Sequence, residues 1–291
     1  MPIKEHPSFD RPVVSTRLWR YMDLPKFASL LTTKKLWMTN AEVLAADDPY
    51  EGMPSAVQLP HRLWKNIDDI PNPFRDEIIK HYMRGPDQTP SDAFRSFCMI
   101  QEQMCIFNQF WRREYYINCW HVALHESVAM WKIYAAPGAG VAVVSNGGRL
   151  ETALKSVEAS LYLGAVKYID PSTVQIDTGN SFDSVMKKRT SFAYESEVRL
   201  VFSDMKNAHD PLSNDKWNDE TMRFDDIIED ARPITPGVAF DCDIPTMIEA
   251  VVVSPFAPSW YTDTIMSFTR AMGYKFPVVA SNLLKSPQII A

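Results

Sequence analysis

The sequence lacks the short motifs that mark several large enzyme classes. It has no Gly-x-Gly-x-x-Gly after an expected strand, no Gly-x-x-x-x-Gly-Lys-Ser/Thr and no Gly-x-Ser-x-Gly. The first two cradle phosphates at a helix N-terminus, and the third presents a nucleophilic serine. Gly138 and Gly140 lack a third glycine and precede a strand pattern, so they indicate a turn. We therefore expect no Rossmann dinucleotide site, no P-loop and no hydrolase elbow.

The sequence is also poor in cysteine and in long apolar runs, and it has no excess of positive charge. Its four cysteines are scattered without a Cys-x-x-Cys pair, which is typical of reduced core thiols in a cytosolic protein. No apolar run approaches the ~20 residues that span a bilayer, and the polar start does not resemble a secretory signal. The net charge of −6 argues against a broad electrostatic grip on nucleic acid or anionic membrane, although it leaves room for a local basic cleft. We expect a cytoplasmic protein without membrane partners.

What the sequence does contain is typical of a globular α+β protein. Its 291 residues are 46% hydrophobic and 23% charged, which is enough to bury a core. Strand patterns interspersed with helix patterns, without a regular βαβ rhythm, favour one α+β domain over a doubly wound sheet. We expect an N-terminal arm over residues 1–16, a helical insertion over 54–113 and a polar surface excursion over 203–236.

Local patterns predict the individual elements. The opening predicts a strand over 18–22, a helix capped by Asp23 with Pro25 in its first turn, and a strand over 35–39. Ser91 is expected to cap a helix that runs to about Arg113. Further strands are predicted over 115–122, 141–145, 160–169, 237–241, 248–254 and 276–280, and further helices over 73–83, 126–135, 148–158, 181–189 and 259–272.

One stretch combines strand periodicity with charge. From Tyr194 to Phe202 residues alternate, so the pattern predicts a strand with Glu195, Glu197 and Arg199 on one side, ~7 Å apart along the chain. Two neighbouring carboxylates repel each other unless a cation, a proton or a substrate compensates them. Two interpretations follow: a solvated strand face with an internal ion pair, or a site at which the carboxylates meet a substrate.

Candidate metal ligands are present but poorly spaced. The loop with Asp47, Asp48 and Glu51 could hold a divalent cation, and a Mg²⁺-dependent nuclease is the weakest functional alternative. This loop lacks the alternating ligand spacing of a calcium-binding loop, so we expect an Asx-turn into Pro49 and not a cation site. A zinc site could be drawn from Cys119, His121 and His125 with Glu126. The fourth ligand would not be local, so we expect no metal.

Four sequence blocks occur together over most of the chain. They are Leu18-Trp-Arg-Tyr21 with Leu36-Trp-Met-Thr-Asn40 and Asp48-Pro-Tyr-Glu-Gly52; Cys119-Trp-His121 with Glu126-Ser127 and Met130-Trp131-Lys132-Ile133-Tyr134; Phe192-x-x-Glu195-x-Glu197-Val198-Arg199; and Val253-Ser254-Pro255. As a set these blocks resemble the bacterial family labelled domain of unknown function 2971. That family name implies no activity.

The order of elements also resembles the ADP-ribosyltransferase fold, including DNA-modifying toxins of the DarT type. In that fold a split sheet holds NAD⁺ between an early strand with Arg or His and a late strand with glutamate. The resemblance implies Glu197 as catalytic carboxylate, Glu195 as its partner at the acceptor, His121 near the cleft and Arg20 as pyrophosphate anchor. It implies a stacking wall for nicotinamide or a target base, drawn from Tyr21, Trp120, Trp131 and Tyr134.

The implied activity is therefore an NAD⁺-dependent ADP-ribosyltransferase acting on nucleic acid or protein, as a toxin or antiphage defence effector. Two departures keep alternatives open. The Ser-Thr-Ser signature of arginine-modifying transferases is not evident, and Arg20 could instead pair with Glu51 or Glu195. A non-catalytic ligand- or protein-binding module of the same family is the main alternative. The hypothesis requires Glu197 to face a pocket shared with Arg20.

Overall fold

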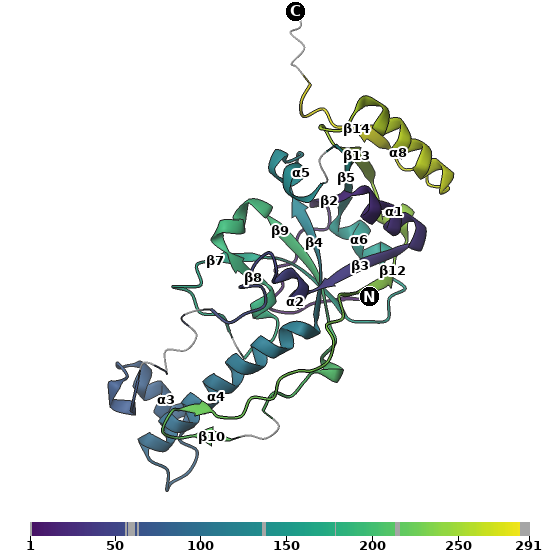
Figure 1. Ribbon diagram of the computed structural model, residues 1–291. Helices are drawn as coiled ribbons and strands as arrows, with labels where there is room; N and C mark the ends of the chain where they lie inside the picture. The colour runs from purple at the N-terminus through teal and green to yellow at the C-terminus, as the bar shows by residue number, and fades with distance from the viewer. Residues whose placement is uncertain are drawn as a thin grey trace, which may run out of the picture.

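A mixed ten-stranded sheet runs through the protein (Figure 1). The computed structural model describes residues 2–55, 57, 62, 64–135, 138–177, 179–212 and 216–285. Along the sheet the strands follow the order β1-β6-β9-β4-β2-β5-β13-β14, and β3 joins β4 on one side and β12 on the other. The two terminal pairs, β1–β6 and β13–β14, are parallel, and the other pairings are antiparallel. The expected α+β class is confirmed at this level.

The elements have the following bounds. The sheet strands are β1 (Ile3–Lys4), β2 (Arg17–Asp23), β3 (Lys35–Asn40), β4 (Tyr115–Val122), β5 (Gly140–Asn146), β6 (Leu161–Ala165), β9 (Glu197–Ser203), β12 (Gly237–Asp241), β13 (Ala250–Val253) and β14 (Val278–Ala280). Two small pairs are β7 (Lys167–Ile169) with β8 (Lys187–Arg189), and β10 (Trp217–Asn218) with β11 (Arg223–Phe224). The helices are α1 (Leu24–Thr33), α2 (Ala41–Leu44), α3 (Phe74–Tyr82), α4 (Pro90–Trp111), α5 (Val128–Tyr134), α6 (Gly147–Ala153), α7 (Ile244–Met247) and α8 (Ser259–Ala271).

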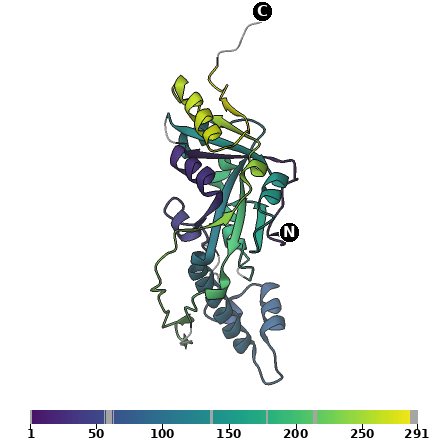
Figure 2. The ribbon, with the colours of Figure 1, turned by 90° about the vertical axis from the view of Figure 1, so that its right-hand side faces the viewer.

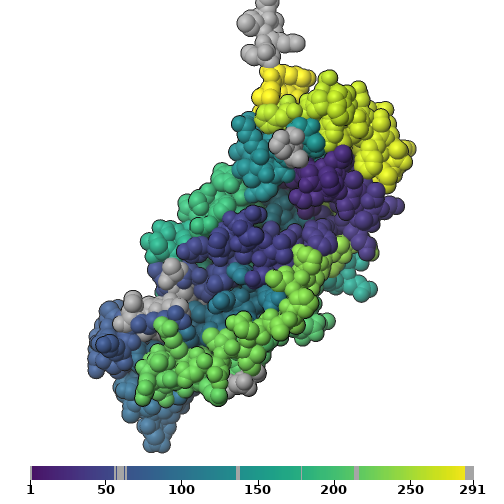
Figure 3. Space-filling model, in the orientation of Figure 1, coloured from purple at the N-terminus to yellow at the C-terminus, as the bar shows by residue number. Residues whose placement is uncertain are grey.

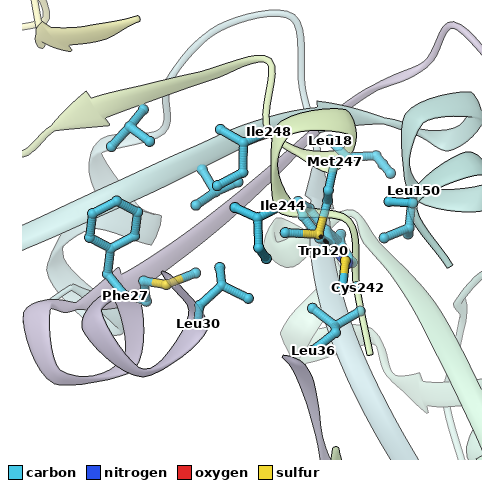
Figure 4. Packing of buried hydrophobic residues seen from close by; sticks show 14 of the residues in the cluster. Leu18, Phe27, Leu30, Leu36, Trp120, Leu150, Cys242, Ile244, Met247 and Ile248 are labelled. Atoms are coloured by element: carbon cyan, nitrogen blue, oxygen red, sulfur yellow. Dashed lines mark hydrogen bonds between the residues drawn. The ribbon is translucent and has the colours of Figure 1, made fainter. Parts of the chain in front are cut away.

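Helices cover both faces of the sheet. On one face, buried side chains of α1, α6, α7 and α8 pack on the strands in the largest core cluster, part of which is drawn in Figure 4. On the other face, α5 packs against β2 and β5, and α2 with the turn before β8 packs against β4 and β9. Apolar burial at ~25 cal/mol per Å² is the main stabilising contribution on both faces.

The predicted strand–helix–strand opening is confirmed. The Asp23 side chain accepts a hydrogen bond from the backbone N–H of Lys26, and Pro25 lies in the first turn of α1. The apolar stripe Phe27, Leu30 and Leu31 faces the core. Capping and periodicity act within a few residues, which explains why the sequence predicted this unit so closely.

Part of the chain extends away from the sheet. The long helix α4, with α3 beside it, forms an extension at the opposite end of the molecule from α8 (Figures 1 and 2). The described parts of the segment 203–236, residues 203–212 and 216–236, run along this extension on the surface (Figure 3) and pack on α4 through Leu212 and Phe224. The N-cap of α4 is Thr89, two residues before the predicted Ser91, because Thr89 and Asp92 form a reciprocal capping box. Within the described residues, no helix is long and apolar enough to cross a membrane.

The helix predicted over 181–189 is wrong, because this segment contains a short turn and strand β8. The strand predicted over 160–169 is confirmed, although it is divided into β6 and β7. The reason is tertiary: β7 and β8 pair with each other in parallel, from Lys167↔Lys187 to Ile169↔Arg189. Such a long-range pairing leaves no signal in the local pattern.

Candidate functional site

The sheet divides along one edge of β4. At one end β4 pairs with β2 through Trp19↔His121, and at the other with β3 through Thr39↔Ile117. Between these pairings Cys119 lies beside a gap between β2 and β3. A cavity of about 570 Å³ opens here and is lined from both faces of the sheet. This volume lies in the range of small-molecule and cofactor sites.

The cavity brings together most of the residues that the sequence singled out. Glu195, Glu197, His121, Arg20, Tyr21, Trp120 and Tyr134 all line it. Trp131 does not: it is buried in the core, where its Nε1–H donates to Glu126 at 2.9 Å and its ring meets Tyr21 edge-on. The condition that Glu197 should share a pocket with Arg20 is met.

The Glu195–Glu197 segment differs from the predicted strand. Glu195 ends a 3₁₀ turn (Thr190–Glu195), Ser196 has a left-handed φ of 40°, and β9 begins at Glu197. The two carboxylates are therefore not neighbours on one strand face. Neither is solvated, because Glu195 is 3% and Glu197 4% exposed. The interpretation as a solvated face is wrong, since the turn directs both side chains into the protein.

Lys188 links the two carboxylates. Its Nζ lies 2.5 Å from Glu195 Oε2 and 3.4 Å from Glu197 Oε2. Its Nζ also lies 4.6 Å above the ring of Phe192. Although burial opposes it, the charges of Glu197 and Glu195 raise the pKa of Lys188, so the ammonium stays protonated.

Arg199 forms the centre of the ion-pair network. It is 1% exposed, and it donates to Glu51 through Nη1 and Nη2 at 2.6 and 2.7 Å and to Glu197 through Nε at 2.9 Å. Nη1 also donates to the carbonyl of Val185 at 2.5 Å. This guanidinium is surrounded by acceptors, as a buried charge must be.

Glu197 is ionised by its neighbours. Burial alone would raise its pKa, but the charges of Arg199 and Lys188 outweigh burial and lower the pKa from 4.5 to about 2. The thiol of Cys119 also hydrogen-bonds the carboxylate, and burial with the charge of Glu197 raises the pKa of that thiol. Cys119 is therefore a neutral donor in the cavity wall and not a reactive thiolate.

The network carries an excess of negative charge. Three carboxylates, those of Glu51, Glu195 and Glu197, share two cations, Arg199 and Lys188. In a low-dielectric cavity such an excess favours a cationic ligand group or a transition state that develops positive charge.

The acidic loop at 47–51 is held by arginines. Asp48 pairs with Arg189 at 2.7 Å, as Glu51 does with Arg199. The Asp48 side chain also accepts from the N–H of Tyr50 at 3.1 Å, which confirms the predicted Asx-turn. In the part of the chain that the structure describes, no group of three or more His, Cys, Asp or Glu side chains could hold a metal ion.

His121 is held in one orientation. Its Nδ1 lies 2.5 Å from the carbonyl oxygen of Glu195. A carbonyl can only accept, so Nδ1 carries the hydrogen, and neutral imidazole keeps its lone pair on Nε2. The ring lies 6.1 Å from that of Tyr21, centroid to centroid. In register across three strands, Trp19, His121 and Glu197 share one face of the sheet.

Two tyrosines are fixed beside these groups. Tyr134 donates its hydroxyl to Glu195 Oε1, and burial and this carboxylate raise the pKa of Tyr134. The hydroxyl of Tyr21 accepts from the N–H of Ser127 at 2.9 Å, and burial raises its pKa to about 12. Both phenols therefore stay neutral at ordinary pH.

Arg20 is the opposite case to Arg199. It is half-buried in the cavity wall, and among the residues that the structure describes it has neither an ion-pair nor a hydrogen-bond partner. Burial lowers its pKa to about 10, since no carboxylate compensates the loss of water. The alternative in which Arg20 pairs with Glu51 or Glu195 is wrong, because Arg199 and Lys188 occupy those carboxylates.

Sequence reasoning missed several residues of the cavity wall, among them Lys188 and Trp37. Lys188 follows no motif, although its position a few residues before Glu195 was compatible with a contact. Trp37 belongs to the block Leu36-Trp-Met-Thr-Asn40, but no pattern in the sequence indicates a ligand-binding role for it. Comparisons with protein-family models, curated proteins and solved structures found no match to this chain.

Proposed function

We propose that the protein is an NAD⁺-dependent ADP-ribosyltransferase of the split-sheet type. The observation that carries the proposal is that an unpaired arginine lines the same cavity as an ion-pair network with one more carboxylate than cations. NAD⁺ has matching chemistry, with an anionic pyrophosphate and a cationic nicotinamide ring. Arg20 would bind the pyrophosphate through charge-assisted hydrogen bonds.

The carboxylates would stabilise the reacting ribose. The bond between ribose C1′ and nicotinamide breaks, and its electron pair leaves on the nicotinamide nitrogen. Glu197, ionised at any pH well above 2, would stabilise the oxocarbenium-like centre and accept a bond from the ribose 2′-hydroxyl. Among its bonds to the two cations, Oε1 accepts one, from Arg199 Nε, and Oε2 accepts two, so the 2′-hydroxyl would donate to Oε1.

The acceptor would attack from the side of Glu195 and His121. An acceptor oxygen or nitrogen forms the new bond to C1′, and its proton passes to His121 Nε2 or to Glu195. Tyr21, Trp120 and Tyr134 would form the apolar wall around nicotinamide. The acceptor class is nucleic acid or protein, in the role of a toxin or antiphage defence effector.

The second candidate is a non-catalytic module that binds the same ligand. It is favoured by the hydrogen bonds that Glu197 already accepts from Arg199 and Lys188. In this interpretation the carboxylate has a structural role. Such a protein binds NAD⁺ but does not cleave it.

Nicotinamide release from NAD⁺, with and without nucleic-acid and protein acceptors, separates the candidates. The proposal expects release by the wild type, and a loss of about 10²- to 10³-fold in Glu197→Gln with binding retained in calorimetry. Glu220→Gln, at an exposed position, is the matched control. Binding without release supports the module, and neither binding nor release rejects both.

A further inference from the structure

Trp37 stands out in the cavity wall because its large apolar side chain is only partly covered. It lies in the middle of β3, lines the cavity and is 44% exposed. Its neighbours in the strand, Leu36 and Met38, point to the other face and are fully buried in the core. An indole left this open beside a cavity has an accessible apolar surface for a ligand.

The structure holds the indole in place from one side. β12 runs antiparallel to β3 and puts small residues beside the ring, with Ala239 opposite Trp37 and Gly237 opposite Thr39. A Cβ built at Gly237 would lie 2.3 Å from Cζ2 and 2.5 Å from Cε2 of Trp37. The six-membered ring therefore rests against the backbone at Gly237, a contact that any side chain there would prevent.

The β3 wall of the cavity also carries a charged side chain. Lys35 and Thr39 alternate with Trp37 along β3, and all three line the cavity, with Lys35 paired to Asp241 of β12 at 3.7 Å. Across the gap in the sheet, Arg20 lines the same cavity from β2 and has no partner within the described chain. A cavity that offers both an open indole and the unpaired Arg20 is suited to a nucleotide, whose base stacks while its phosphate meets the cation.

We propose that Trp37 is the platform for the adenine ring of the dinucleotide, with Gly237 as the residue that positions the indole. The inference rests on the proposed function, because it assigns the adenosine half of NAD⁺ to the β3 side of the cavity. The pyrophosphate then lies toward Arg20, and nicotinamide lies toward Glu197 and His121. This arrangement spans the gap between β2 and β3.

Titration calorimetry with two ligands tests the assignment. NAD⁺ contains adenosine, whereas nicotinamide mononucleotide lacks it. For Trp37→Ala we expect the affinity for NAD⁺ to fall on the order of 10- to 100-fold, with the affinity for nicotinamide mononucleotide unchanged. Trp37→Phe keeps an aromatic face and restores most of the NAD⁺ affinity. Trp260→Ala, which removes an exposed indole from α8, is the matched control and should leave both affinities unchanged.

The outcomes separate this inference from the proposed function. If the wild type binds NAD⁺ and Trp37→Ala binds it equally well, the adenine platform is wrong and the proposed function stands. An equal loss for both ligands also overturns the assignment, because it places Trp37 at a part that the ligands share. If the wild type binds neither ligand, the proposed function and this inference fail together.

Discussion

Two arginines of one sheet, Arg199 and Arg20, show opposite ways of placing a charge inside a protein. Arg199 in β9 has carboxylates and a carbonyl around its guanidinium, and its pKa is raised above the ordinary value. Arg20 in β2 lies beside the gap in the sheet without such partners in the described chain, and burial lowers its pKa to about 10. Both line the same cavity.

The difference separates structural from functional charge. A buried ion costs several kcal/mol in lost hydration unless hydrogen bonds and counter-charges compensate it. At Arg199 the protein supplies that compensation, so the residue holds β9, the 47–51 loop and the β8 region together. At Arg20 compensation is missing, and an anionic ligand would supply it. Removing the two arginines should therefore have opposite consequences.

The largest expected effect is on stability at Arg199. Arg199→Met leaves Glu51 and Glu197 buried without their shared cation, so we expect a loss on the order of 3–5 kcal/mol in the free energy of unfolding. Chemical denaturation monitored by circular dichroism measures this. Arg17→Met, at an arginine of β2 whose ion pair with Glu249 at 3.6 Å is solvent-exposed, should change stability by less than about 1 kcal/mol. Equal effects would contradict the structural role.

Acid should weaken the same network. The pKa of Glu197 is lowered from 4.5 to about 2 in the folded state, so its stabilising contribution is complete above about pH 4.5 and is lost as pH falls through 2. The shift corresponds to a loss on the order of 3 kcal/mol. Denaturant midpoints between pH 6 and 2 should decline less in Glu197→Gln than in the wild type. Parallel declines would show that Glu197 is not the titrating group.

The turn between the two carboxylates should be sensitive to side-chain shape. Ser196 has a φ of 40°, which β-branched residues rarely adopt, and its carbonyl accepts from the N–H of Val122 at 2.9 Å. We expect Ser196→Val to lower stability by about 1–3 kcal/mol. Ser196→Gly should be close to neutral, because relief of strain offsets the entropy of glycine. Thermal unfolding of both variants measures this difference in stability. Equal losses of stability in the two variants would refute the strain argument.

The smallest stability effect is expected at Arg20. Arg20→Met removes a partly buried charge without orphaning a partner in the described chain, so stability should stay level or rise by up to about 1 kcal/mol. Chemical denaturation of Arg20→Met and Arg199→Met under the same conditions compares their free energies of unfolding directly. A loss of more than about 2 kcal/mol in the free energy of unfolding would mean that Arg20 also has a structural role, and would contradict the distinction between the two arginines.

The parts of the fold that the sequence predicted are those governed by local chemistry. Asp23, Pro25 and the apolar stripe of α1 act within a few residues, and the opening was predicted nearly residue for residue. The segment from 181 to 196 was mispredicted, because the β7–β8 pairing and the left-handed Ser196 arise from distant contacts. Local propensity cannot contain that information.

The site shows the same limit. Charge alternation singled out Glu195 and Glu197, and the resemblance to the ADP-ribosyltransferase fold implied that Arg20 lies in the same cleft. Which arginine is compensated depends on Glu51, which lies far from Arg199 in the sequence and pairs with it in the fold. No sequence pattern encodes that choice, and it decides which cation is left for a ligand.

Calorimetric titration of NAD⁺ into the wild type, Arg20→Met and Arg17→Met tests the central claim most directly. We predict that the wild type and Arg17→Met bind equally, and that Arg20→Met binds on the order of 10- to 100-fold more weakly while remaining at least as stable. Equal affinity in all three proteins, or no binding by the wild type, would contradict the assignment of Arg20 as the ligand's cation.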